Sequence, residues 1–154
     1  PAFPEPEVDD NGQTFFKIGK EKFNSKKQVK EFIQFQVIKS IASLINTVGG
    51  TLVIGIYEKD NIKELVGIER EGFESQDKYE RHLAQILTNK LGQVNVSEYI
   101  TIRFEDYEGL NVCIVNCKKY TRELVLLDDA VYRRTGPLIE KLTTQQVLKL
   151  MRQN

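Results

Sequence analysis

The sequence carries no net charge, because its 154 residues hold 22 lysines and arginines against 22 aspartates and glutamates. Strong non-specific binding to nucleic acid needs many phosphate-neutralising cations, so the overall balance argues against it. The charge is unevenly spread, however. Residues 17–30 carry six lysines and one glutamate, and residues 118–134 carry further lysines and arginines. A local basic patch and a merely solvated lysine-rich face both fit this pattern.

The sequence also lacks an apolar run long enough to cross a membrane, and its first residues, PAFPEPEVDD, lack the pattern of a secretory signal peptide. We therefore expect a cytoplasmic protein that does not bind membranes. Cysteine is scarce. Cys113 and Cys117 fall in a predicted strand, where residues four apart are about 13 Å apart, too far for a disulfide. Their spacing is not that of zinc ligands, so two buried thiols in a reducing compartment are expected.

Histidine occurs once, as His82, in a predicted helix and without cysteine or aspartate at metal-ligand spacing. We expect it at the surface. Serine, cysteine and histidine never gather in a recognisable nucleophile motif. We therefore predict no catalytic residue, no metal ligand and no cofactor.

The chain opens with a segment unlike the rest. Residues 1–13 hold three prolines, several acids and an Asn-Gly pair, which favour a tail or the stump of a linker. Residues 14–154 then form one domain, of a length that suits a single core.

The first predicted helix begins at Ser25, with Ser25 and Gln28 as a capping box, and runs to about residue 47. Between residues 37 and 48 it is apolar nearly all round. The exceptions, Lys39, Ser43 and Asn46, form one narrow polar stripe that we expect to face solvent or ligand.

Gly49 and Gly50 follow this helix and let the chain reverse into a strand at residues 51–57. The strand is apolar on both faces, which is typical of a central strand covered on both sides. A phosphate-binding loop would need a lysine and the order strand, loop, helix, and this turn has neither. The glycines therefore predict a bend.

The remaining patterns complete an α+β fold. Residues 62–68 read as a hairpin partner, residues 76–91 as a helix capped by Ser75, and residues 99–106 and 111–117 as strands. Two short strands at 123–127 and 130–134 flank an Asp-Asp turn, and a capping box at Thr143 starts a last helix at 144–152. The expected order is αββαββββα, with a mixed, largely antiparallel sheet and helices packed on it.

The stretch VYRRTG, residues 131–136, carries the best candidate chemistry. Tyr132 and Arg134 share one strand face, where an aromatic ring can stack a base and an arginine can hold a phosphate. The alternative is an edge strand whose charges discourage aggregation.

Together these motifs resemble the Schlafen AlbA-like domain family. The family typically shows a helix ending in Asn-Thr-x-Gly-Gly-x-Leu-x-Ile-Gly-Val, then a Val-Gly hairpin and a late Tyr-Val-Arg-x-Gly strand. The matching positions are Asn46, Thr47, Gly49, Gly50, Leu52, Ile54, Gly55, Gly67, Tyr132, Arg134 and Gly136. The segments DKYERHLAQILTNKLG, ITIRF and VCIVNC are similar to a bacterial branch often found as the C-terminal part of larger proteins.

The resemblance implies an α+β fold and nucleic-acid binding. Some relatives are described as divergent ATPase-like domains and others as metal-dependent ribonucleases. The ribonucleases carry acids in a Glu-x4-Glu-Phe-Lys segment and just after the Gly-Val strand. Here Phe15 replaces the nearer acid, Asp10 falls near the farther one, and Tyr57, beside Glu58, replaces the third. Arg133 also replaces the family's usual valine, which predicts an exposed edge strand.

We therefore predict a module that binds the phosphate backbone of DNA or RNA within a larger bacterial regulatory or defence protein. The predicted contacts are Lys17, Lys20, Lys39, Asn46, Tyr132, Arg133 and Arg134, and the predicted structural positions are Thr47, Gly49, Gly50, Gly55, Gly67 and Gly136. A second hypothesis is a protein-interaction or dimerisation domain, a homodimer that binds no nucleic acid. A third is a degenerate magnesium-dependent nuclease that uses Glu58 and neighbouring acids.

Overall fold

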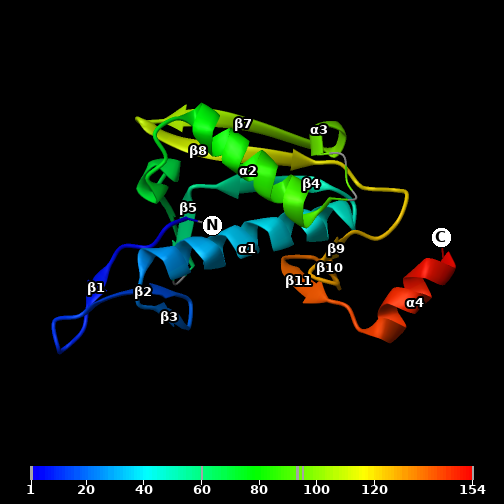
Figure 1. Cartoon of the computed structure of the whole chain (residues 1–154), viewed down its shortest axis with the longest axis horizontal. Helices are drawn as coiled ribbons and strands as arrows, with labels where there is room; N and C mark the ends of the chain where they lie inside the picture. Colours follow the sequence, from blue (N-terminus) through cyan, green and yellow to red (C-terminus); the bar gives the residue numbers. More distant parts are fainter. Residues whose placement is uncertain (1, 60, 93, 95, 154) are drawn as a thin grey trace. The chain divides into compact units, whose positions relative to one another are not determined.

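The computed structural model describes residues 2–59, 61–92, 94 and 96–153. It divides into two compact units. The first unit contains residues 1–37, 53–79 and 103–114, and the second contains residues 38–52, 80–102 and 115–154. The described residues form four α-helices and eleven strands in largely antiparallel sheets, which confirms the α+β class (Figure 1). Among them, no helix is both long and apolar enough for a membrane span.

The first unit begins with a meander of three strands that the sequence analysis did not predict: β1 (Glu7–Val8), β2 (Thr14–Ile18) and β3 (Glu21–Phe23). Phe3 is 4% exposed and packs edge-on against Phe16, with 5.8 Å between the ring centroids. Arg70 donates a hydrogen bond to the carbonyl oxygen of Phe3. Residues 2–13 therefore belong to the folded unit, and their role as a linker stays a prediction.

The expected strand at residues 51–57 is broken at Gly55, where φ is 116°. The Gly55 carbonyl accepts hydrogen bonds from the backbone of both Val66 and Gly67, and a Cβ on Gly55 would lie 3.2 Å from Gly67 Cα. The chain then changes partners. Strand β4 (Gly50–Ile54) joins the sheet β4-β8-β7, whereas β5 (Ile56–Lys59) forms a hairpin with β6 (Ile62–Leu65), as predicted.

The prediction of a central strand at residues 51–57 was wrong. In the three-stranded sheet the middle position belongs to β8 (Leu110–Cys117), between β4 and β7 (Ile100–Tyr107). Residues 112–115 of β8 are all buried, whereas Gly50 and Thr51 of β4 are exposed. The apolar pattern on both faces of residues 51–57 thus suggested a middle strand, although β8 occupies that position. Both cysteines of β8 are buried, and neither forms a disulfide within the described residues, as expected.

Helix boundaries follow the predicted caps. Helix α1 (Lys26–Ile45) begins after Ser25, whose Oγ accepts a hydrogen bond from Gln28 N at 3.3 Å. Helix α2 (Gln76–Lys90) begins after Ser75, whose Oγ accepts from Lys78 N at 3.2 Å. A 3₁₀ turn, η1 (Ile68–Glu71), precedes α2, and a short helix, α3 (Val96–Tyr99), precedes β7. His82 lies on α2 and is exposed, as expected.

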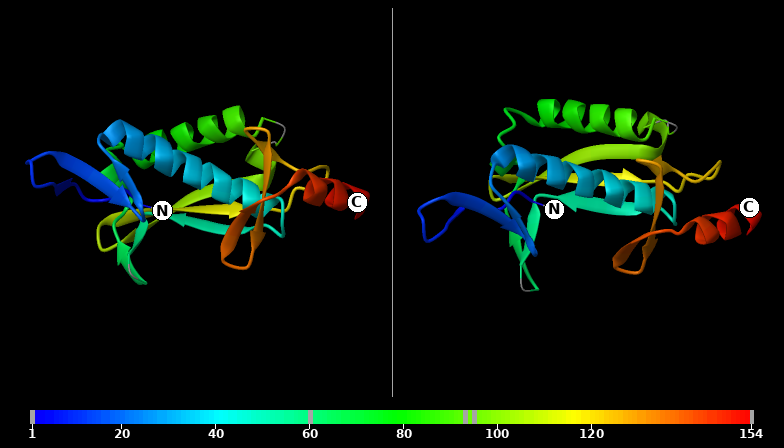
Figure 2. Two further views of the ribbon diagram at one scale, coloured as in Figure 1. Left: turned by 90° about the horizontal axis from the view of Figure 1, so that it is seen from below. Right: turned by 60° about the horizontal axis from the view of Figure 1, so that its bottom comes forward.

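In the second unit a three-stranded sheet has the order β11-β10-β9, with β9 (Leu126–Leu127), β10 (Ala130–Thr135) and β11 (Leu138–Lys141). Asp128 and Asp129 have φ values of 48° and 62° and make the predicted turn. The structure contains β11, which was not predicted, and β10 therefore lies between β9 and β11. The prediction that β10 is an exposed edge strand was wrong. Helix α4 (Thr144–Gln153) follows β11 directly (Figure 2).

Candidate nucleic-acid interface

The end of α1 holds strand β10 through two polar side chains. Asn46 Nδ2 donates to the carbonyl oxygens of Val125 at 2.9 Å and Tyr132 at 3.0 Å, and its Oδ1 accepts from Val125 N at 2.7 Å. Thr47 Oγ1 accepts from Arg134 N at 2.9 Å and donates to Ser43 O at 2.8 Å. We call Asn46 and Thr47 the strand clamp. It fixes the backbone of the residues whose side chains are the best candidates for ligand contact.

The prediction that the polar stripe on α1 faces solvent or ligand was wrong for two of its three residues, Ser43 and Asn46. Ser43 is fully buried and Asn46 is 6% exposed. The partners of Asn46 are backbone groups 79 and 86 residues later in the chain, and helical periodicity contains no information about them. Both donor positions of the Asn46 amide are used internally, so Asn46 has no side-chain donor left for a ligand.

Gly49 and Gly50, which follow the strand clamp, lie so close to neighbouring atoms that neither position has room for a side chain. Gly49 has a φ of 78°, and its N–H donates to Leu44 O at 2.8 Å, which closes the helix end. A Cβ on Gly49 would lie 2.6 Å from Cys117 O, and one on Gly50 would lie 2.9 Å from Leu44 Cδ2. Both positions serve the bend.

Two faces of β10 carry candidate contacts. On one face, Tyr132 and Arg134 are half-buried, and Lys39 Nζ of α1 lies 6.0 Å from the centroid of the Tyr132 ring. This distance is at the limit of a cation–π contact. Arg134 Nε donates to Gly136 O at 3.2 Å, which orients the guanidinium near the turn between β10 and β11. The predicted pairing of Tyr132 with Arg134 thus gains a third member in Lys39.

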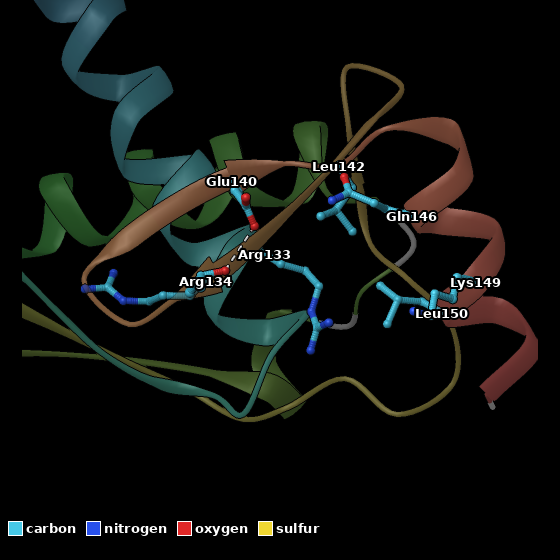
Figure 3. A pocket seen from close by; sticks show the side chains of 8 residues that line it. Arg133, Arg134, Glu140, Leu142, Gln146, Lys149 and Leu150 are labelled. Atoms are coloured by element: carbon cyan, nitrogen blue, oxygen red, sulfur yellow. Dashed lines mark hydrogen bonds between the residues drawn. The ribbon is translucent and has the colours of Figure 1, made fainter.

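On the opposite face, Arg133 lines a hollow of about 410 Å³ between the β10–β11 hairpin and α4. Gln146, Lys149 and Leu150 of α4 form the other wall, and Arg134 extends the other way (Figure 3). Arg133 also lines a smaller hollow of about 130 Å³ with Lys119 and Glu123. Its Nε is shielded from solvent and has no hydrogen-bond partner among the described residues.

The sequence analysis missed the contribution of α4. The Thr143–Gln146 capping box predicted this helix, and the structure shows both of its hydrogen bonds, at 2.8 and 3.2 Å. No local pattern, however, indicated that Lys149 lines the same hollow as Arg133. The cluster of Lys39, Tyr132, Arg133, Arg134 and Lys149 lies within the second unit, and we call it the cationic cluster.

Lys17 and Lys20 belong to the first unit. Both are exposed, Lys17 on β2 and Lys20 in the turn before β3. Both were predicted to contact the same nucleic acid as Lys39, Asn46, Tyr132, Arg133 and Arg134. The structure describes them only within their own unit, so their contribution stays a prediction.

The acids considered for a nuclease are distributed over the first unit. Glu58 is exposed on β5 opposite Lys63, and Asp10 lies in the turn between β1 and β2. Within the described ranges, no three histidine, cysteine or acidic side chains gather in a way that could hold a metal ion. The third hypothesis therefore gains no support from these positions.

A different acid in the first unit has an unusual environment. Burial raises the pKa of Glu71 to about 7, although a hydrogen bond with Tyr79 and the charge of Lys30 favour its ionised form. Burial also raises the pKa of Tyr79, and the neighbouring Glu71 adds to this shift. Glu71 Oε2 has no hydrogen-bond partner among the described residues. Sequence reasoning did not single out this pair.

Comparison with known proteins finds a matching family and similar solved structures. The model of a family described as "Schlafen, AlbA_2" matches residues 13–143. The solved structure of the DIP2311 protein from Corynebacterium diphtheriae matches 98% of this chain with a TM-score of 0.57 and 17% sequence identity. That likeness supports the fold alone, and the chain spans 23% of that protein. No curated protein was found to match.

Proposed function

This chain belongs to the Schlafen AlbA_2 family, and we propose that it is a nucleic-acid-binding module that holds the phosphate backbone of DNA or RNA. The observation that carries the proposal is the cationic cluster around β10. In this proposal the module is part of a larger bacterial regulatory or defence protein, as the family resemblance suggests.

The chemistry of the cluster suits a nucleic-acid strand. Lysine and arginine neutralise phosphates, and arginine offers a planar fork of donors that matches phosphate oxygens. A tyrosine ring can stack an unpaired base without regard to its identity. Contacts of this kind position a ligand without reading its sequence.

The strand clamp supports the same proposal. Because Asn46 and Thr47 fix the backbone of Tyr132 and Arg134, these side chains start from a fixed position when a ligand binds. The neutral overall charge is compatible with such a site, since the second unit holds 11 lysines and arginines against 6 aspartates and glutamates, whereas the first unit holds 11 against 16.

Salt dependence tests the proposal. If the four cations of the cluster each neutralise one phosphate of a single strand, log K should fall with log salt with a slope of about −3. Arg134→Ala should weaken binding and reduce this slope by about 0.7. The measurement is fluorescence anisotropy with single- and double-stranded DNA and RNA, with and without magnesium.

The matched control is Lys63→Ala, which removes one positive charge from an exposed position on β6 in the first unit. It should leave the affinity and the salt slope unchanged. Equal effects of Arg134→Ala and Lys63→Ala, or no binding to any probe, would refute the assignment of the site to the cationic cluster.

A protein-interaction or dimerisation domain is the second candidate, and one observation favours it. Leu148 and Met151 of α4 are 50% and 62% exposed, and Leu138 of the neighbouring β11 is 67% exposed. A mass that rises with concentration in light scattering, and that Met151→Glu returns to the monomer value, would support this candidate. A monomer at all concentrations would count against a homodimer.

A further inference from the structure

The hollow between the β10–β11 hairpin and α4 differs from the rest of the cationic cluster. The Arg133 side chain extends toward α4, whereas the Arg134 side chain, which also lines the hollow, extends the other way (Figure 3). We infer that this hollow binds the terminal phosphate of a nucleic-acid strand, a phosphate monoester, rather than an internal phosphodiester. The inference rests on the proposed nucleic-acid binding and specifies which part of the ligand this face receives.

Arg133 has a buried donor that an anion could satisfy. Its Nε–H is shielded from solvent and makes no hydrogen bond within the described part of the chain. A buried donor without a partner is unfavourable, and the cost is greater for a charged group. An anionic oxygen that enters the hollow would satisfy this donor and use the remaining N–H groups of the guanidinium fork.

The wall of the hollow opposite Arg133, formed by α4, also carries groups that suit an anion. Lys149 supplies a second cation from α4. Gln146 Oε1 accepts a hydrogen bond from Thr143 N, which fixes the side-chain amide, and its NH₂ group can donate to an anion. The one acid in the lining, Glu140, accepts a hydrogen bond from Thr135 Oγ1 at 3.1 Å. Among the described side chains that line the hollow, cations therefore outnumber acids.

The size of the hollow and the way into it favour a strand end. A volume of about 410 Å³ is in the range of sites for single small molecules. Because the Arg133 Nε is shielded from solvent, a ligand oxygen reaches it only when a group enters the hollow and the guanidinium shifts. A strand end can do so, but a phosphodiester within a continuous strand is flanked by nucleotides on both sides. A phosphate monoester also carries a charge of about −1.5 to −2 at pH 7 and has three terminal oxygens.

The family match ends at residue 143, just before α4. The wall that holds Gln146, Lys149 and Leu150 therefore lies outside the matched region. This hollow is a property of the present chain and need not be shared by relatives that lack such a helix.

The test compares three single strands of one sequence that differ only at their ends: a 5′-phosphate, a 3′-phosphate, or hydroxyl groups at both ends. We expect one phosphorylated strand to bind about tenfold more tightly than the hydroxyl strand. Arg133→Gln and Lys149→Gln should each bring this ratio close to one. Lys63→Ala is the matched control and should leave the ratio unchanged.

The outcomes separate the inference from the proposed function. Salt-sensitive binding of all three strands with equal affinity would overturn the inference and leave the nucleic-acid proposal standing. Binding of a nucleoside 5′-monophosphate or inorganic phosphate, without binding of any strand, would overturn both and identify a free-anion site. A preference for a phosphorylated end that survives both substitutions would also overturn the inference, because the end would then bind elsewhere.

Discussion

Replacement of Asn46 by alanine should destabilise the protein without any involvement of ligand. The change removes three hydrogen bonds, of 2.7, 2.9 and 3.0 Å, and leaves one N–H and two carbonyl groups of the hairpin region without this partner. Asn46 and Val125 are both buried. At about 1 kcal/mol for each hydrogen bond, we expect a loss of about 3 kcal/mol in the free energy of unfolding.

Urea unfolding followed by circular dichroism measures this loss, and a thermal scan should show a fall in Tm of about 6–12 °C for a chain of this size. Asn116→Ala is the matched control. Asn116 Oδ1 accepts one hydrogen bond from Thr51 Oγ1, at 2.8 Å and in an exposed position. Its replacement should cost less than about 1 kcal/mol.

Asn46→Asp refines the test because it keeps the acceptor for Val125 N and loses the donors to both carbonyl oxygens. Its carboxylate would face those oxygens, so this variant should be at least as unstable as Asn46→Ala at pH 7 and should recover in part when acid protonates the side chain. An Asn46→Ala protein of unchanged stability that binds nucleic acid less well would refute the clamp and restore Asn46 as a ligand contact.

Three further outcomes follow from local environments. Because the pKa of Glu71 is raised from 4.5 to about 7, the folded state binds the Glu71 proton more tightly than the unfolded state does. The contribution of Glu71 to stability therefore falls as pH rises from about 4.5 to 7. In urea unfolding at each pH, Glu71→Gln should be about 2–3 kcal/mol more stable than the parent at pH 8 and nearly equal to it at pH 4.5. Gly49→Ala should lower the free energy of unfolding by about 1–3 kcal/mol, since φ is 78° and the new Cβ would lie 2.6 Å from Cys117 O; Gly12→Ala, with a similar φ and nothing within 4 Å of its Cβ, is the control that isolates the steric part. Burial raises the pKa of the Cys117 thiol to about 12, so thiol reagents at pH 8 should modify it only after denaturation, and rapid labelling of the native protein would contradict this.

Sequence reasoning succeeded where the determinants are local. Helix starts at Ser25, Ser75 and Thr143 depend on residues three apart, and all three caps form as expected. The Asp128–Asp129 turn and the β5–β6 hairpin were recognised for the same reason. The family resemblance, which depends on several such segments in order, is confirmed by the match over residues 13–143.

Sequence reasoning failed where the structure depends on contacts between segments that are far apart in the chain. The strands β1 and β3, which were not predicted, have two and three residues, so they contain too little alternation for a period to show. The strand predicted at residues 123–127 is present, but β9 comprises only Leu126–Leu127. At the site, strand alternation correctly separated Tyr132 and Arg134 from Arg133, but the internal partners of Asn46 and the approach of Lys149 depend on contacts distant in sequence. Polar residues on an apolar helix indicated a special position, and the structure was needed to show that the special partner is the chain itself.

The order in which the chain builds its two units has a consequence for biosynthesis. Each unit is assembled from three separate segments, and the segments alternate along the sequence. A ribosome must therefore deliver residues up to 114 before the first unit has all of its parts, and the second unit must wait for residues beyond 115. We expect the first unit to be complete before the second during translation, so a nascent chain that stalls near residue 114 would expose apolar segments of the second unit.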